Sequence, residues 1–128
     1  MVIGDGNKQA DIMLIGEGPG QQEDLSGVPF VGPAGKLLDK MLASVNLDRK
    51  DVYIANIVKC RPPGNRDPHE DEQEACMNYL RYQLTLVKPK IIVCLGRVAA
   101  TAIIDKNFKI TKEHGEWVER KGYWITAT

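Results

Sequence analysis

The sequence predicts an α/β fold with a mostly parallel central sheet and helices on both faces, a three-layer α/β/α arrangement. Three short apolar runs have the length and the β-branched content of buried strands: residues 12–15, 52–58 and 91–95. Amphipathic segments separate these runs, and strands that alternate with helices form parallel sheets covered on both sides. With 128 residues, the chain is expected to form one domain over residues 1–128.

The first half of the chain supplies two of these strands and one helix. Residues 1–10 are polar, contain glycine and have no apolar period, so we expect an irregular entry segment there. The strand at residues 12–15 is followed by a Gly/Pro-rich loop that extends to Gly35. Five apolar residues then recur at helical spacing and predict an amphipathic helix that packs on the sheet: Leu37, Leu38, Met41, Leu42 and Val45.

The second half of the chain alternates in the same way. Residues 67–70, with the sequence Asp-Pro-His-Glu, are typical of a helix start, and this helix is expected to end before Pro89. Gly96 follows the third strand and introduces a short helix, and residues 116–128 predict a β-hairpin around a Lys-Gly turn. The apolar residues expected to pack in these elements are Cys76, Tyr79, Leu80, Leu84, Val87, Val98, Ala99, Ala102, Ile103, Trp117, Val118, Trp124 and Ile125.

The composition excludes several classes of protein. Lys and Arg together number 17, as do Asp and Glu, so the net charge is zero and a uniformly basic surface is excluded. A local basic patch is still enough to contact nucleic-acid phosphates. No apolar run approaches the roughly 18 residues that span a membrane, so no membrane partner is expected. Three sparse cysteines do not make a disulfide scaffold and favour a cytoplasmic protein, with a monomer as the default state.

The segment from residue 11 to residue 35 has the character of a ligand pocket. A buried strand ends there in a loop of glycines and a proline, residues 16–20, and open α/β sheets place ligands where such strands end. Glycine permits positive φ and a close approach of the backbone to a ligand. The same segment carries two carboxylates, Glu17 and Glu23, and a lone aromatic side chain, Phe30.

Three motifs follow one another in this order: Gly16-Glu17-Gly18-Pro19-Gly20 with Glu23-Asp24, Gly27-Val28-Pro29-Phe30-Val31-Gly32, and Asn56-Ile57-Val58-Lys59-Cys60-Arg61-Pro62-Pro63. Their order and spacing resemble those of the family 4 uracil-DNA glycosylases, the iron–sulfur type of bacteria and archaea. The resemblance extends from about residue 4 to residue 128. A single Gly-rich loop would be weak evidence for the family, because nucleotide-binding proteins also have such loops. It implies the uracil-DNA glycosylase fold and a DNA repair hydrolase that flips uracil out of DNA and cleaves its N-glycosidic bond.

The resemblance implies a role for the residues that line the pocket. Phe30 is expected to stack on the uracil ring. The Asn56 amide is expected to pair with uracil O4 and N3–H, an arrangement that rejects cytosine because its exocyclic amine is a donor. Further substrate contacts are expected from the loop residues Gly16, Glu17, Gly18, Pro19 and Gly20.

The resemblance leaves the catalytic carboxylate open between two residues. Gly18 stands where family 1 enzymes have a water-orienting aspartate, so the carboxylate must be Glu17 or Glu23. We favour Glu23 for supporting the loop or the water, and Glu17 for lining the site. Backbone groups of Glu17, Gly18 and Pro19 would hold the O2 side of uracil, where negative charge develops as the base departs.

The cysteines fit the family's [4Fe-4S] cluster only in part. Cys60 and Cys76, with C-x15-C spacing, match its third and fourth ligands, and a cluster normally takes four thiolates. Cys94 lies inside a predicted strand, where a small apolar side chain is expected. Family members carry the first two ligands ahead of the stretch that this chain matches and a His-Pro motif after it. We therefore expect a domain that is incomplete at both termini, lacks a complete cluster and has weak activity or none.

These residues also have plainer interpretations. Phe30 is compatible with a core residue, Asn56 with a strand-end cap, and the two glutamates with solvated loop acids. Three basic residues beside the predicted pocket are expected to contact DNA phosphates: Lys59, Arg61 and Arg66. The functional alternative is a catalytically inactive module with the same fold that binds nucleic acid or a nucleotide.

Overall fold

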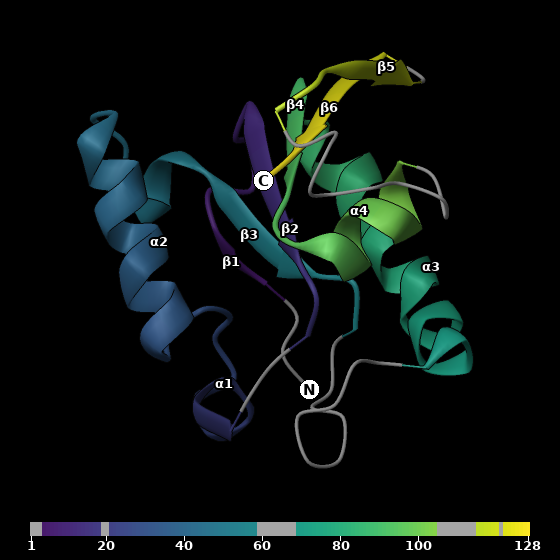
Figure 1. Ribbon diagram of the computed structural model, residues 1–128, viewed down its shortest axis with the longest axis horizontal. Coiled ribbons are helices and arrows are strands. Elements are labelled where there is room, and N and C mark those ends of the chain that lie inside the picture. The colour runs from purple at the N-terminus through teal and green to yellow at the C-terminus, as the bar shows by residue number, and fades with distance from the viewer. Residues whose placement is uncertain (1–3, 19–20, 59–68, 105–114, 121) are drawn as a thin grey trace.

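A six-stranded mixed sheet forms the centre of the computed structural model, which describes residues 4–18, 21–58, 69–104, 115–120 and 122–128. The strand order is β1-β3-β2-β4-β6-β5 (Figure 1). The four middle strands pair in parallel, and the two edge strands pair antiparallel to their neighbours. The strands are β1 (Asp5–Gly6), β2 (Ile12–Gly16), β3 (Tyr53–Asn56), β4 (Ile91–Cys94), β5 (Val118–Arg120) and β6 (Tyr123–Ala127).

Helices cover both faces of this sheet. Figure 1 shows α2 on one side and α3 and α4 on the other, which confirms the predicted three-layer α/β arrangement. No helix in the described part of the chain combines the length and the hydropathy needed to cross a membrane. The helices are α1 (Gln21–Ser26), α2 (Pro33–Ser44), the short 3-10 turn η1 (Arg49–Asp51), α3 (Glu70–Val87) and α4 (Arg97–Ile103).

The core is divided by the sheet into two clusters, as the alternation of side chains along β2 requires. Met13 and Ile15 face the larger cluster, which α3 and α4 cover with Leu80 and Ala99 among others. Leu14, the residue between them, faces the smaller cluster. The other buried members of the smaller cluster are Leu38, Leu42, Val52 and Ile54.

The prediction of an irregular segment over residues 1–10 is wrong in part. Asp5 and Gly6 form β1 and pair with Ile54 and Tyr53 of β3, and Asn7 N–H donates to Val52 O at 3.0 Å. A pairing of this length uses backbone hydrogen bonds and no apolar side chains, so it leaves no periodic signal in the sequence. The helix α1, within the loop that follows β2, was also not expected.

Several residues that were expected to pack are exposed. On α2 the buried stripe consists of Leu38 and Leu42, each 6% exposed, because the helix meets the sheet along a narrow line. The neighbouring positions Leu37, Met41 and Val45 are half or more exposed and do not pack on the sheet. The same correction applies to Tyr79, Trp117 and Trp124, which are also about half exposed.

Candidate functional site

The candidate site begins where β2 and β3 end side by side. Gly16 and Asn56 are register partners in this parallel pair. Beyond them the pairing continues, since Ile57 N–H donates to Gly16 O at 2.8 Å and Val58 N–H donates to Glu17 O at 3.0 Å. Parallel strands place their carboxyl ends at one edge of the sheet, the edge where such folds bind ligands. Asn56 is 2% exposed there.

Gly16 brings the predicted aromatic and amide side chains together. A Cβ atom at this position would lie 2.6 Å from Asn56 Oδ1 and still closer to the tip of the Phe30 ring. Both distances are shorter than any that a real Cβ tolerates, so only glycine fits between the two side chains. The residues that sequence reasoning singled out from two separate motifs therefore lie against one glycine.

The backbone at Phe30 has an unusual conformation. Its φ is 54°, in the left-handed region that a bulky residue adopts only when its surroundings impose it. Gly35, in the first turn of α2, lies against this backbone, and a Cβ there would collide with the Phe30 carbonyl. The half-buried ring of Phe30 packs at the edge of the smaller core cluster.

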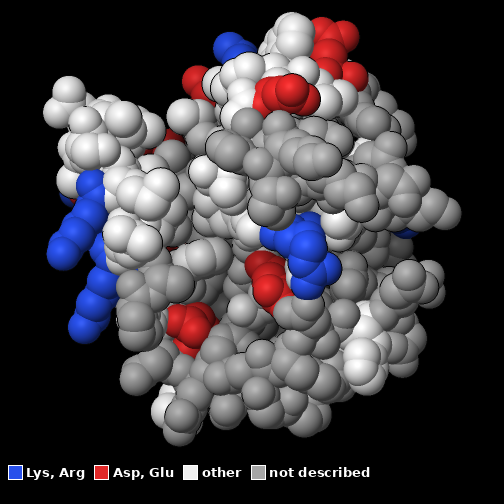
Figure 2. Space-filling model, viewed as in Figure 1, with Lys and Arg blue, Asp and Glu red and all other residues white. Residues whose placement is uncertain are grey.

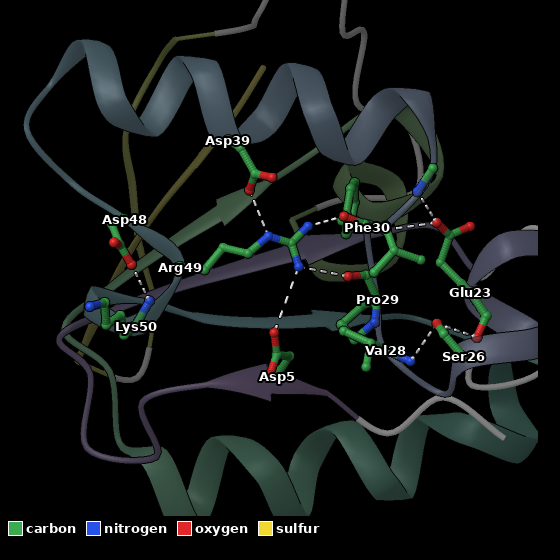
Figure 3. A network of polar contacts seen from close by, with 12 residues as sticks. Asp5, Glu23, Ser26, Val28, Pro29, Phe30, Asp39, Asp48, Arg49 and Lys50 are labelled. Atoms are coloured by element: carbon green, nitrogen blue, oxygen red, sulfur yellow. Dashed lines mark hydrogen bonds and ion pairs between the residues drawn. The ribbon is translucent and has the colours of Figure 1, made fainter.

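Glu23 holds the same loop from the side of α1. Its Oε2 atom accepts hydrogen bonds from Val31 N–H at 2.8 Å and from Gly32 N–H at 2.6 Å (Figure 3). A carboxylate that accepts from two backbone N–H groups makes strong, charge-assisted hydrogen bonds. This geometry is that of loop support, one of the two roles considered for Glu23.

Arg49 holds the loop from the opposite side, and sequence reasoning missed it. Its guanidinium donates to Pro29 O at 3.0 Å, to Phe30 O and to Asp39 Oδ1 at 2.6 Å, and it lies 3.6 Å from a carboxylate oxygen of Asp5 (Figure 3). Arg49 follows Phe30 by 19 positions in the sequence and lies outside the three motifs that predicted the site. It is one of 17 Lys and Arg residues, so no sequence signal distinguished it.

The remaining predicted residues are only partly covered by the described structure. Glu17 and Gly18 follow Gly16 and are half-buried at the sheet edge. Cys76 lies in α3, and nothing is described of its side chain. The other predicted residues lie outside the described ranges: Pro19, Gly20, Lys59, Cys60, Arg61 and Arg66.

The described residues do not fit a four-thiolate metal cluster. Within the described ranges, no group of three or more His, Cys, Asp or Glu side chains lies close enough together to hold a metal ion. Cys94 is fully buried at the end of β4, and burial raises the pKa of its thiol to about 12. It therefore stays protonated at neutral pH, whereas a metal ligand must be a thiolate.

The fold and this site define a class of protein: an α/β protein with an aromatic ring and an amide beside a Gly-rich loop at the carboxyl ends of its strands. The chain belongs to the uracil DNA glycosylase superfamily, whose family model matches residues 3–128. This confirms the resemblance inferred from the three motifs.

The relatives are named more narrowly. The chain is 58% identical over 104 residues to the type-4 uracil-DNA glycosylase of Archaeoglobus fulgidus, with 81% of this chain and 52% of that protein covered. It is 46% identical over 123 residues to that of Thermotoga maritima (95% and 64% covered). It is 52% identical over 111 residues to that of Saccharolobus solfataricus (85% and 51% covered). The chain thus spans about half to two thirds of the length of these relatives.

Proposed function

We propose that this chain is the core of a DNA repair glycosylase that flips uracil out of DNA and hydrolyses its N-glycosidic bond, leaving an abasic site. The observation that carries the proposal is the position of Gly16, which lies against both the Phe30 ring and the Asn56 amide. A flipped base needs one group that stacks on its face and one that reads its edge. Membership of the superfamily and the type-4 names of the relatives support the same activity.

Asn56 is the residue that we assign to base recognition. Its side-chain amide offers one donor and one acceptor side by side, which match O4 and N3–H of uracil. Cytosine presents a donor where uracil has O4, so one of the two hydrogen bonds is lost and a buried group is left unsatisfied. Burial of Asn56, at 2% exposure, makes such a mismatch costly because water cannot replace the missing partner.

The proposal assigns a separate role to each of two carboxylates, Glu23 and Glu17. Because Glu23 Oε2 already accepts from two N–H groups of the loop, we assign Glu23 to positioning the loop that carries Phe30. Glu17, half-buried directly after Gly16, is then our candidate for orienting the attacking water. The carbonyls of Gly16 and Glu17 are engaged by the segment that continues β3, so we assign the N–H groups of this loop to stabilising charge on the departing base.

The proposal also includes contact with DNA and an iron–sulfur cluster. We assign phosphate contact to Lys59, Arg61 and Arg66, which follow β3 in the sequence beside the proposed pocket. On the face shown in Figure 2, the described Lys and Arg side chains lie at several separate places. The proposed protein acts as a monomer. Cys60 and Cys76 are the positions assigned to cluster binding, and a cluster of four thiolates needs two ligands besides them. No catalytic step in the proposal involves that cluster.

The binding of free bases to the chain tests the proposal. Uracil is expected to shift the backbone amide NMR signals of Gly18, Phe30 and Asn56, with much weaker shifts from thymine and cytosine. The variant Asn56→Ala is expected to weaken uracil binding about tenfold or more, the range for losing the partner of a buried hydrogen-bonding group. The exposed Asn7→Ala serves as the matched control. Equal responses to uracil and cytosine would contradict the proposal.

A second assay separates the enzyme from the inactive module. An oligonucleotide with one deoxyuridine is incubated with the chain, and abasic sites are detected by alkaline strand cleavage. Cleavage at deoxyuridine supports the hydrolase. Binding of uracil and of DNA with no abasic product favours the alternative, a module that keeps the fold and the pocket but not the chemistry.

A further inference from the structure

We propose that Arg49 is a positioning residue that fixes the Phe30 ring in the pocket, a role that rests on the proposed function of that ring. Arg49 itself belongs to the short turn η1, which precedes β3, and its side chain points toward Pro29 and Phe30 between Asp39 and Asp5 (Figure 3). It has no assigned contact with a base. Its effect on binding would pass entirely through the backbone at Pro29 and Phe30.

The contacts of Arg49 join three separate elements to this loop. The guanidinium donates to the carbonyls of Pro29 and Phe30, to Asp39 of α2, and forms an ion pair with Asp5 of β1. Its side chain is 20% exposed, and its hydrogen bonds to the Pro29 and Phe30 carbonyls are partly buried. Partly buried charged hydrogen bonds of this kind are stronger than those at an exposed surface.

The loop needs such support because of its backbone conformation. A left-handed φ at a bulky residue is unfavourable and persists only where neighbouring contacts impose it. Glu23 accepts from the N–H groups of Val31 and Gly32, while Arg49 donates to the carbonyls of the two residues before them. The four consecutive residues 29–32 are therefore held from both sides, with Phe30 among them.

A general contribution to stability does not explain why Arg49 donates to these particular acceptors. Two acceptors of Arg49 are the carbonyls next to the Phe30 ring, and the planar guanidinium reaches them together with Asp39 in one fixed geometry. Lysine carries the same charge, but as a single ammonium group it cannot reproduce this fork. Arg49→Lys therefore keeps the positive charge but removes the forked hydrogen bonds that would fix the Phe30 loop.

The first readout is the position of the ring, which is independent of any ligand. The sequence contains two phenylalanines, so the Phe30 ring signals can be assigned by comparison with Phe30→Leu. The nuclear Overhauser effect between the Phe30 ring and the Gly16 α-protons is expected to be strong in the unmodified chain. It should be lost in Arg49→Ala and strongly reduced in Arg49→Lys, and it should persist in the control Lys50→Ala, which alters the exposed next residue.

The second readout is uracil affinity. Arg49→Lys and Arg49→Ala are each expected to weaken uracil binding about tenfold or more, since hydrogen bonds to charged groups are lost from the loop. Guanidinium ion at concentrations too low to unfold the chain is expected to restore binding to Arg49→Ala, and ammonium ion is not. Rescue by guanidinium alone is a signature that loss of general stability would not give.

The outcomes distinguish this proposal from the proposed function. If the unmodified chain fails to bind uracil but the ring contact depends on Arg49, the proposed function fails and the positioning role stands. Unchanged ring contact in folded Arg49→Lys, together with uracil affinity within about twofold of the unmodified chain, would overturn the positioning role, since a lost charged hydrogen bond costs more than that. If Arg49→Ala does not fold, the Arg49→Lys comparison decides alone, because it keeps the charge.

Discussion

Gly16 is the residue on which the candidate site depends most directly. A methyl group at this position would collide with both the Phe30 ring and the Asn56 amide. We expect Gly16→Ala to displace one of these side chains, to cost about 1–3 kcal/mol of stability through overpacking and to abolish measurable uracil binding. Urea denaturation and titration of the NMR signals with uracil measure the two effects.

Gly122→Ala provides the matched control for this substitution. Gly122 lies in the β5–β6 turn, has a φ of +86° and would place a Cβ in open space. The change therefore strains the backbone without touching the site, and uracil affinity should be unchanged. Undiminished uracil binding by Gly16→Ala would show that the pocket lies elsewhere.

At the residue scale, the sequence pointed to some residues of the candidate site and gave no indication of others. Phe30, Asn56 and Glu23 were predicted because each stands within a motif whose spacing carries information. Arg49 was not predicted, since its role arises from a fold that brings η1 behind a loop about twenty residues earlier. In this loop Arg49 donates to backbone carbonyls. Every residue has a backbone carbonyl, so the sequence does not indicate this contact.

The helix α2 shows how an element can be predicted correctly while its buried face is not. Five apolar residues at helical spacing predicted the helix, yet only Leu38 and Leu42 among them pack on the sheet. The short strand β1 shows the converse, because its pairing with β3 depends on backbone groups alone. Apolar periodicity therefore located the central strands and the larger helices, whereas β1 and α1 lacked such a signal.

The two neighbouring leucines of α2 give an element-scale prediction. Leu38→Ala removes a buried side chain and is expected to lower the free energy of unfolding by about 2–5 kcal/mol. Leu37→Ala makes the same chemical change on a side chain that is 60% exposed and should cost no more than about 0.5 kcal/mol. Urea denaturation measures both, and equal losses would mean that α2 packs through a different face.

At the scale of the whole molecule, the parallel centre of the sheet could be predicted from the sequence. The full set of residues that meet at the carboxyl ends of its strands could not. The central strands β2 and β3 are buried on both faces and are almost wholly apolar, which is a strong signal. At their carboxyl ends, the site combines residues from two motifs with a residue from η1 that belongs to neither. The sheet also buries the thiol of Cys94, whose ionisation is linked to unfolding of the whole chain.

The stability of the whole molecule is expected to fall at high pH because of Cys94. Burial raises the pKa of its thiol to about 12, above the value near 9 that it has in the unfolded chain. Between these values the folded state holds a proton that the unfolded state has lost. Stability from this source is thus complete below about pH 9 and decreases by at most about 1.4 kcal/mol per pH unit as pH rises toward 12.

The variant Cys94→Ala isolates this effect from other groups that titrate in alkali. Lysines, tyrosines and the other two cysteines are the same in both chains, so their contributions cancel in the difference between the two unfolding free energies. We expect the unmodified chain to lose stability more steeply than Cys94→Ala above about pH 9, with parallel curves below it. Parallel curves through about pH 11 would mean that the thiol ionises as readily in the folded chain as in the unfolded one, and that water reaches the centre of the sheet.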